Sequence, residues 1–410
     1  MHTVSAHKKL QDFSSRTNFL TDLFCSKTHL KPDECMHIEQ GFEMKIPLAS
    51  PFFDDEMKEA AIDALLGERF VLGESVFKFE EEFARYCGVD YAVSTSSGTS
   101  ALQLSLLALG VKRGDQVITT PASFVATANV ALHVNAFPVF VDINIETYDV
   151  DPKLLEKKVS AKTRAVIPVH LYGFPADMNS ILEISRKHGF AVVEDACQAH
   201  GAEYYGRKVG SIGDVGCFSF YSVKNMTVCG DGGMVVTNDE KIARTVAKLR
   251  DCGRVSHYTH DMIGFTCRLN TVNAAIGRVQ LRRLEKWNKK RRASAKLYDS
   301  LLADLDEVML PPTGNSAVKP VYHLYVIRTR FRDELKAWLE QKGVQCGIHY
   351  PLPIHLQPIY RRLFGYKEGD FPESELLCKT ALSLPIFPKL ERREIGYVCE
   401  KIREFFVRQT

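Results

Sequence analysis

Short apolar runs alternate with helix-forming segments from about residue 91 onward, and this alternation restricts the fold more than any other feature. The runs YAVSTS, QVITTP, PVFVDI, AVIPVHLYG and AVVEDA are typical of strands. Between them lie segments with apolar residues at helical spacing, such as TSALQLSLLALG, FVATANVALHVN and MNSILEISRKHG. The strands lack the regular apolar–polar alternation of a sheet with one wet face. The pattern therefore predicts an α/β fold whose mostly parallel sheet is covered by helices on both faces.

The chain is predicted to have three parts. Residues 1–44 are polar and show no sustained period, so we interpret them as an N-terminal extension that is partly disordered or packs over a neighbouring surface. Their four histidines have no fixed spacing, which disfavours a metal site. Residues 45–295 are predicted to form a large α/β domain, and residues 296–410 a smaller α+β C-terminal domain. The basic run Arg282–Arg292 could bind an anion, but a solvated helix face is the simpler interpretation.

Composition disfavours several classes of function. The 410 residues carry a formal net charge of +3, with a pI of about 8.2, which is too mild to indicate a nucleic-acid or membrane partner. No apolar run is long enough for a membrane helix, and the N-terminus lacks the apolar segment of a signal peptide. The 11 cysteines include no C-x-x-C pair and no ligand-like spacing with histidine. We therefore expect free thiols, no metal site and a cytoplasmic location.

Three stretches carry candidate chemistry, and a parallel sheet would bring them together at the carboxyl ends of its strands. The first is STSSGTSALQL, where a strand ends and a helix begins. Gly98, Thr99 and Ser100 would present N–H groups at a helix N-terminus, which suits an anion. An ordinary Ser/Thr helix cap is the alternative. The stretch is neither a Walker A loop nor a G-x-G-x-x-G fingerprint, which counts against a nicotinamide dehydrogenase.

The other two stretches supply an acid and an amine. Glu194 and Asp195 end the run AVVED, where they could hold a metal, move a proton, pair with a cationic ring or cap the next helix. Lys224 lies between the β-like runs FSFYS and MVVTN, and lysine is rarely buried without a partner or a reaction. Burial and nearby charges lower a lysine pKa, as Schiff-base lysines require. An anion cradle, a strand-end aspartate and a buried lysine are the parts of a pyridoxal phosphate (PLP) site.

Several motifs, taken in order, resemble those of the fold type I sugar aminotransferases of the DegT/DnrJ/StrS group. They are SGTSALQLSLLALGVKRGDQVITTPASFVATANV, PVHLYG, VVEDACQAHGA and GDVGCFSFYSVKNMTVCGDGGMVVTND, with PFFDDEMKEAAIDALL before them and IHYPLPIHLQPIY after them. The resemblance extends from about Pro47 to the C-terminus. It implies a fold type I PLP-transferase in which the large α/β domain binds the cofactor.

The resemblance also implies roles for individual residues. Lys224 corresponds to the lysine that holds PLP covalently as an internal aldimine, and Asp195 to the partner of the pyridine nitrogen. Gln198 corresponds to the residue beside the ring hydroxyl, and Phe124 to the aromatic residue stacked on the ring. The phosphate-binding positions correspond to Gly98, Thr99 and Ser219. Because Lys224 is not a histidine, the dehydratase branch of the group is disfavoured.

One motif departs from the pattern of the group. In IGFTCRLNTVNAAIG, Thr266 and Cys267 stand where Asn and Tyr are usual, whereas Arg268 is kept. In the group this Asn reaches the phosphate of the neighbouring subunit's cofactor, so the resemblance implies a homodimer with its active site at the subunit interface. The shorter Thr266 hydroxyl could still make that hydrogen bond.

The C-terminal motif IHYPLPIHLQPIY contributes the candidate substrate contacts. It resembles a sugar-facing segment of the group, so His349, Tyr350 and His355 are expected to contact the sugar, with ordinary packing as the alternative for each. The resemblance implies transfer of an amino group from L-glutamate to a keto sugar, here a nucleotide-linked one, through pyridoxamine phosphate. A keto sugar phosphate or a cyclitol ketone is the alternative substrate. A ligand-binding homologue without turnover is the alternative outside enzymes.

Overall fold

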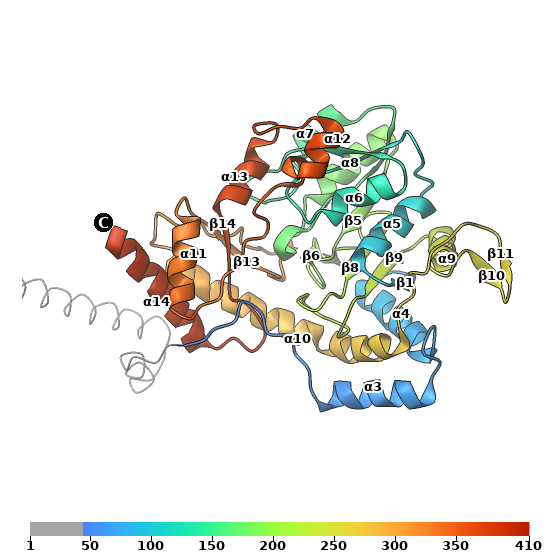
Figure 1. The fold of residues 1–410 in the computed structure, drawn as a ribbon, viewed down its shortest axis with the longest axis horizontal. Coiled ribbons are helices and arrows are strands. Elements are labelled where there is room, and N and C mark those ends of the chain that lie inside the picture. The colour runs from blue at the N-terminus through green and yellow to red at the C-terminus, as the bar shows by residue number, and fades with distance from the viewer. Residues whose placement is uncertain (1–43, 410) are drawn as a thin grey trace, which may run out of the picture.

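The computed structural model describes residues 44–409 and contains a seven-stranded central sheet (Figure 1). The strand order is β1-β9-β8-β5-β4-β2-β3, with every pair from β8 to β3 parallel and β9 antiparallel to both of its neighbours. The predicted mostly parallel α/β class is therefore confirmed. The strands are β1 (Tyr91–Thr95), β2 (Gln116–Thr119), β3 (Phe137–Phe140), β4 (Thr163–Val166), β5 (Ala191–Asp195), β8 (Val215–Ser219) and β9 (Gly233–Thr237).

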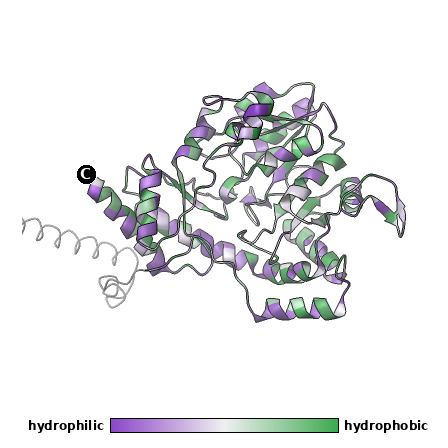
Figure 2. Cartoon of the chain, in the orientation of Figure 1, coloured by the Kyte–Doolittle hydropathy of each residue, from purple (hydrophilic) through white to green (hydrophobic). Residues whose placement is uncertain are grey.

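Helices connect and cover these strands, and a small three-stranded sheet, β12-β6-β7, and two-stranded pairs lie outside the central sheet. In Figure 2 the helices around the sheet carry both hydrophobic and hydrophilic residues, as expected for elements with one buried side. The helices up to α9 are α3 (Asp55–Gly67), α4 (Glu74–Cys87), α5 (Gly98–Ala108), α6 (Ala126–His133), α7 (Pro152–Lys158), α8 (Met178–His188) and α9 (Glu240–Leu249). The short strands are β6 (Glu203–Tyr204), β7 (Arg207–Lys208), β10 (Arg254–Ser256), β11 (Thr259–His260) and β12 (Val318–Lys319).

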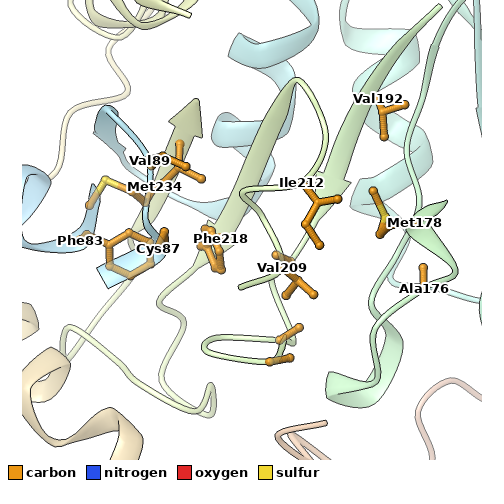
Figure 3. Packing of buried hydrophobic residues seen from close by; sticks show 14 of the residues in the cluster. Phe83, Cys87, Val89, Ala176, Met178, Val192, Val209, Ile212, Phe218 and Met234 are labelled. Atoms are coloured by element: carbon orange, nitrogen blue, oxygen red, sulfur yellow. The ribbon is translucent and has the colours of Figure 1, made fainter. Parts of the chain in front are cut away.

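Both faces of the sheet are buried, which explains the missing alternation in the sequence. Adjacent residues of β5 serve different cores, since Val192 belongs to one hydrophobic cluster and Val193 to another. The first cluster includes residues of α4 and α8, and the second includes residues of α5, α6 and α9. Figure 3 shows part of the first cluster, in which Phe83 and Met178 join strand residues such as Phe218. Every strand position therefore gains from an apolar side chain.

One expected strand is shorter than its apolar run. In AVIPVHLYG, β4 ends at Val166, and Leu171–Gly173 forms a single 3-10 turn, η1. Pro168 has no N–H to continue the ladder, although its carbonyl still accepts from Asp195 N at 2.9 Å. The apolar character of the later residues comes from packing, because Leu171 and Tyr172 belong to a separate buried cluster.

The long helix α10 (Thr271–Leu302) joins the sheet to a second core. Its first half packs in the cluster beneath the sheet, whereas Ala295 to Leu302 pack in a cluster formed by C-terminal residues together with Ile46. In Figure 1, α10 runs from the region of α3 and α4 to that of α14. The remaining elements are β13 (Tyr325–Arg328), α11 (Arg332–Gln341), η2 (Ile354–Leu356), α12 (Pro358–Phe364), α13 (Pro372–Thr380), β14 (Ala381–Leu384) and α14 (Arg392–Gln409). The predicted extension at residues 1–44 lies outside the described residues except for Met44, and the proposed boundary at residue 295 falls within α10.

The basic run on α10 is only partly a solvated face. Arg282 is exposed and pairs with Glu56 at 2.7 Å, as expected for a surface helix. Arg291 is buried instead, and its guanidinium donates to the backbone carbonyls of Tyr322, His323 and Ile386. The interpretation of the whole run as a solvated face was therefore wrong at Arg291. Among the described residues, no helix is both long and apolar enough to cross a membrane.

Glu194 anchors the end of β5 from beneath the sheet. Its buried carboxylate accepts hydrogen bonds from the N–H groups of Gly210, Ile212 and Gly213 at 2.6–2.7 Å. It also accepts from His170 Nε2 at 2.9 Å, since His170 Nδ1 is occupied by the N–H of Ala176. Four donors around a buried carboxylate make a structural anchor rather than a reactive group.

We predict that Glu194→Gln destabilises the fold by about 2–4 kcal/mol, because the amide cannot accept from four donors and its NH₂ group would face backbone N–H groups. Urea unfolding followed by circular dichroism measures this loss. The matched control is Glu81→Gln, whose carboxylate is exposed and paired only with Arg85, and which should stay within about 0.5 kcal/mol of the wild type. Equal stability of the two variants would contradict the anchoring role of Glu194.

Candidate active site

The candidate site lies at the carboxyl ends of β5 and β8. These strands are parallel neighbours, with Asp195 opposite Cys217, so the segments that follow them leave the sheet at the same edge. Asp195 ends β5, Ser219 ends β8, and Lys224 follows in the loop before β9. The sheet thus brings together the acid and the amine that the sequence analysis singled out.

The structure separates the two acids that residue type alone left equivalent and between which the resemblance selected Asp195. Glu194 points into the anchor beneath the sheet, whereas Asp195 points toward α6. Thr127 Oγ1 of α6 donates to Asp195 Oδ2 at 2.8 Å, and the backbone N–H of Cys197 donates to Asp195 Oδ1 at 3.2 Å. Asp195 is 5% exposed, so its carboxylate is held in place but still reachable.

Lys224 occupies a setting that favours its neutral form. The side chain is partly buried, and its burial lowers the pKa of the Lys224 amine below the ordinary value. The nearby Cys197 and Asp195 act in the opposite direction and favour the protonated amine. Since burial has the larger effect, Lys224 is a better nucleophile and base at neutral pH than an exposed lysine.

The start of α5 faces the same edge. Ser97 caps the helix, because its hydroxyl accepts from Ser100 N at 3.1 Å while Ser100 Oγ accepts from Ser97 N at 2.9 Å. The ordinary Ser/Thr helix cap, given above as the alternative to an anion site, is therefore present and uses Ser97 and Ser100. It leaves the N–H groups of Gly98 and Thr99, which cannot bond within the helix, for another acceptor.

Gly98 allows α5 to approach the two strand ends closely. A Cβ atom at this position would lie 2.7 Å from Cys197 Sγ and 2.8 Å from Ser219 Cβ, closer than such atoms can stand. The start of α5 at Gly98, Cys197 and the end of β8 at Ser219 therefore form one tight corner. Ser219 Oγ lies in this corner and accepts only a long hydrogen bond, 3.4 Å, from Tyr221 N.

Gln198 joins the sheet edge to the C-terminal motif. Its Oε1 accepts from Tyr172 N at 2.9 Å, and its Nε2 donates to the Tyr350 hydroxyl at 3.3 Å. The Phe124 ring lies 6.0 Å from the Tyr350 ring, measured between centroids, and Phe124 is 53% exposed. This exposed aromatic ring beside Tyr350 is available to stack on a planar ligand.

Of the three candidate sugar contacts, two lie at this edge and one does not. His349 Nδ1 bonds Ser383 Oγ at 2.9 Å, its carbonyl accepts from the Tyr172 hydroxyl, and burial followed by the charge of Lys224 lowers the pKa of its imidazole. His355 is fully buried, pairs with Glu375 at 3.0 Å and packs against Phe371, which makes its environment that of a core residue.

The segment that departs from the pattern of the group lies beside the start of α5. The carbonyl of Cys267 accepts from Ser96 N at 2.8 Å. Arg268 pairs with Asp251 at 2.7 Å. Thr266 is exposed, and its hydroxyl lies 3.4 Å from Cys252 Sγ. Thr266 and Arg268 thus flank Cys267, whose carbonyl contacts Ser96.

Some residues around Lys224 were not anticipated from the sequence. Thr127 positions Asp195, and in the sequence only its place in the motif ASFVATAN pointed to a role at the site. The buried residues His200, Asn225 and His323 surround the lysine segment. His200 and Asn225 lie within motifs of the group but were assigned no role, and His323 lies outside those motifs. Within residues 44–409, no group of three or more His, Cys, Asp or Glu side chains is arranged to hold a metal ion.

Comparison with known proteins gives one consistent family. Residues 51–403 match the model of the DegT/DnrJ/EryC1/StrS aminotransferase family. The chain is 42% identical over 352 residues to the "Pleiotropic regulatory protein" of Geobacillus stearothermophilus, covering 86% of this chain and 94% of that protein. It is 42% identical over 348 residues to the dTDP-3-amino-3,4,6-trideoxy-alpha-D-glucose transaminase of Streptomyces venezuelae, covering 85% and 91% of the two chains.

Solved structures agree with these sequence matches. S. venezuelae DesV in complex with a ketimine intermediate superposes with a TM-score of 0.83 at 42% identity, over 85% of this chain and 94% of that chain. The PLP-form of the putative sugar aminotransferase Spr1654 from Streptococcus pneumoniae superposes with a TM-score of 0.84 at 26% identity, over 90% and 100%. The predicted fold type I architecture is thereby confirmed.

We predict that Gly98→Ala weakens PLP binding by at least about tenfold, because the new methyl group must push α5 away from Cys197 and Ser219. Titrating PLP into the cofactor-free protein and following its visible absorption measures the affinity. Gly67→Ala is the control, since an added Cβ at Gly67 meets no atom within 4 Å. Unchanged affinity in a folded Gly98→Ala protein would contradict the close fit described for this corner.

Proposed function

We propose that this chain, which belongs to the DegT/DnrJ/EryC1/StrS aminotransferase family, uses PLP to move an amino group from L-glutamate to a nucleotide-linked keto sugar in amino-sugar biosynthesis. The observation that carries the proposal is the convergence of Lys224, Asp195 and the start of α5 at the carboxyl ends of β5 and β8. Every cysteine among residues 44–409 is a free thiol, which is compatible with a reducing, cytoplasmic location.

The residues at the site suit PLP in charge and in placement. Bound PLP supplies an electron sink that stabilises negative charge on a carbon next to the transferred nitrogen. Asp195, held by Thr127, would pair with the ring nitrogen, and the exposed Phe124 ring would cover one face of the cofactor. The N–H groups of Gly98 and Thr99, together with Ser219 Oγ, would receive the phosphate.

Lys224 is assigned the covalent and acid–base work. Its Nζ would hold PLP covalently between turnovers, and its lowered pKa keeps a neutral amine available for that bond. Once the amino donor has taken its place, Nζ would accept the proton from the donor Cα. In the second half-reaction it would deliver a proton to the sugar carbon that receives the nitrogen.

The sugar is proposed to bind against His349 and Tyr350. Gln198 and Tyr172 hold both residues at the sheet edge beside Phe124. His349 is neutral at neutral pH because burial and Lys224 lower its pKa, so it can accept or donate a hydrogen bond to a sugar hydroxyl. His355 is proposed to support the segment through Glu375 rather than to touch the sugar. A nucleotide-linked substrate is supported by the name of the Streptomyces venezuelae relative.

The dimer proposal rests on the segment beside the start of α5. Thr266 is exposed and lies next to Cys267, whose carbonyl accepts from Ser96 N, so it is available to meet a neighbouring subunit. We assign Thr266 the contact to the partner's cofactor phosphate, and Arg268, fixed by Asp251, the support of that loop. A homodimer with its active site at the interface follows from this assignment.

We predict that Lys224→Ala abolishes covalent PLP attachment and all transamination. Borohydride reduction followed by mass spectrometry should find the cofactor on Lys224 in the wild type and on no residue of the variant. Lys241→Ala, in the exposed first turn of α9, should retain both properties. Attachment at another lysine, or full transamination by Lys224→Ala, would overturn the assignment.

We predict that Asp195→Asn still attaches PLP but loses about 10²–10³-fold in turnover, since the amide cannot keep a positive ring nitrogen in place. Formation of 2-oxoglutarate from L-glutamate is the measurement.

The substrate class is tested by supplying nucleotide-linked keto sugars, keto sugar phosphates and cyclitol ketones in parallel. Amino transfer only to the nucleotide-linked sugars is expected. Transfer to none of the three by the wild type would favour a ligand-binding homologue.

A further inference from the structure

Three amide side chains on one face of α10 hold the segment that carries Lys224. Asn273 Nδ2 donates to Val228 O at 2.6 Å, Gln280 Oε1 accepts from Thr227 N at 3.3 Å, and Asn288 Oδ1 accepts from Asn225 Nδ2 at 3.1 Å. These helix positions are seven and eight residues apart, which is about two turns each time, so they lie along one side of the helix. The residues after Lys224 are therefore fixed to a rigid element.

Asn225, the residue next to Lys224, is the centre of this arrangement. It is 3% exposed and uses both of its amide ends. Its Nδ2 donates to Asn288 Oδ1 at 3.1 Å and to the carbonyl of Val321 at 3.2 Å. Its Oδ1 lies 3.2 Å from His323 Nδ1. Three elements far apart in the sequence thus meet on one side chain.

The carbonyls of His200 and Val321 can only accept, and they determine the hydrogen-bond directions in this network. Asn288 Nδ2 donates to His200 O at 2.8 Å, so Asn288 presents its oxygen to Asn225. Asn225 then presents its nitrogen to Asn288 and its oxygen to His323. His323 Nδ1 must therefore carry a proton, which fixes the Nδ1–H tautomer of the imidazole.

The chain is buried to different extents on the two sides of Lys224, although the Lys224 N–H also donates to Tyr221 O at 2.9 Å on the side before it. Tyr221 and Val223, before Lys224, are 51% and 44% exposed, whereas Asn225 and the next three residues are buried. Arg291, one turn beyond Asn288, holds the carbonyls of Tyr322 and His323 and so fixes the third member of the network. The buried residues that follow Lys224 therefore help to fix the position of its backbone.

We propose that Asn225 is the positioning residue of Lys224, and that Asn288 of α10 and His323 hold it so that the amine stays inside the site. The proposal rests on Lys224 as the reactive lysine of the proposed function. The basic helix α10 thereby acquires a role in the reaction: it joins the lysine segment to the second core, where its last residues pack. Gln280 and Asn273 hold the remainder of the segment in the same way.

The electrostatic setting of Lys224 gives a measurable consequence. The titratable groups near its amine are Asp195, Cys197, His200, His323 and His349. Burial lowers the pKa of Lys224 more than these carboxylate and thiol neighbours raise it, and His323 is neutral because burial lowers its own pKa. If the segment is released into solvent, burial is lost and the pKa of the amine rises.

The test uses the cofactor-free full-length protein. Acetic anhydride acetylates neutral amines, so the pH dependence of Lys224 acetylation, followed by mass spectrometry against exposed Lys241, reports the pKa of Lys224. We expect His323→Ala and Asn288→Ala to slow Lys224 acetylation at neutral pH by about tenfold, which corresponds to about one pKa unit. His323→Asn retains a donor near the Nδ1 position and should stay within about twofold of the wild type.

Tyr298→Phe is the matched control for a general loss of packing. It removes one buried hydrogen bond from α10, to Pro385 O, without touching the lysine segment, so it should leave Lys224 acetylation unchanged. Acetylation within twofold of the wild type in both alanine variants would overturn the proposal, as would an equal effect of His323→Asn. If Asn288→Ala does not fold, the two His323 variants decide the matter.

The result is independent of transamination. Should the protein fail to transfer amino groups while the alanine variants change Lys224 reactivity, the proposed function falls and the positioning role stands. Should transamination be found while Lys224 reactivity is insensitive to Asn288 and His323, the opposite holds.

Discussion

The parallel pairing of β5 with β8 is the constraint on which the rest of the site depends. It places the ends of two buried strands side by side, so that Asp195 and Ser219 emerge at one edge and the Lys224 loop follows immediately. The pairing is stabilised from both faces, by apolar residues above and below and by the four hydrogen bonds to Glu194. Moving β5 by one residue relative to its neighbours would exchange the faces of Glu194 and Asp195, so that Asp195 would face the donors that now surround Glu194.

The site combines groups that are costly to place near one another. An amine with little contact to water and a buried carboxylate each need compensation. Thr127 and the N–H of Cys197 compensate Asp195, and the lowered pKa of Lys224 reduces the charge that must be buried. The reactive residues therefore need a rigid surrounding, which the buried sheet supplies beneath Asp195 and α10 supplies behind Lys224.

Sequence reasoning anticipated the fold class and the core of the site but not its long-range contacts. The alternation of strands and helices predicted the sheet, and the acid, the lysine and the Gly-Thr corner were recognised because each follows or precedes an apolar strand. Periodicity left Glu194 and Asp195 equivalent, since side-chain direction depends on the pleat, and only the resemblance to the group singled out Asp195. His355 and Arg291 could not be identified as buried, because their partners Glu375 and the carbonyls near residue 322 are distant in the sequence.

By itself, the sequence determined which residues were available and which elements they would form, because periodicity and helix caps are local properties. It also determined family membership, which depends on motifs in a fixed order. Only the tertiary structure decided the side-chain contacts of the two acids, which histidine reaches the site and how Asn225 is held between Asn288 and His323. Those outcomes depend on strand register and on the path of a 32-residue helix that crosses two cores, and neither is encoded at a single position.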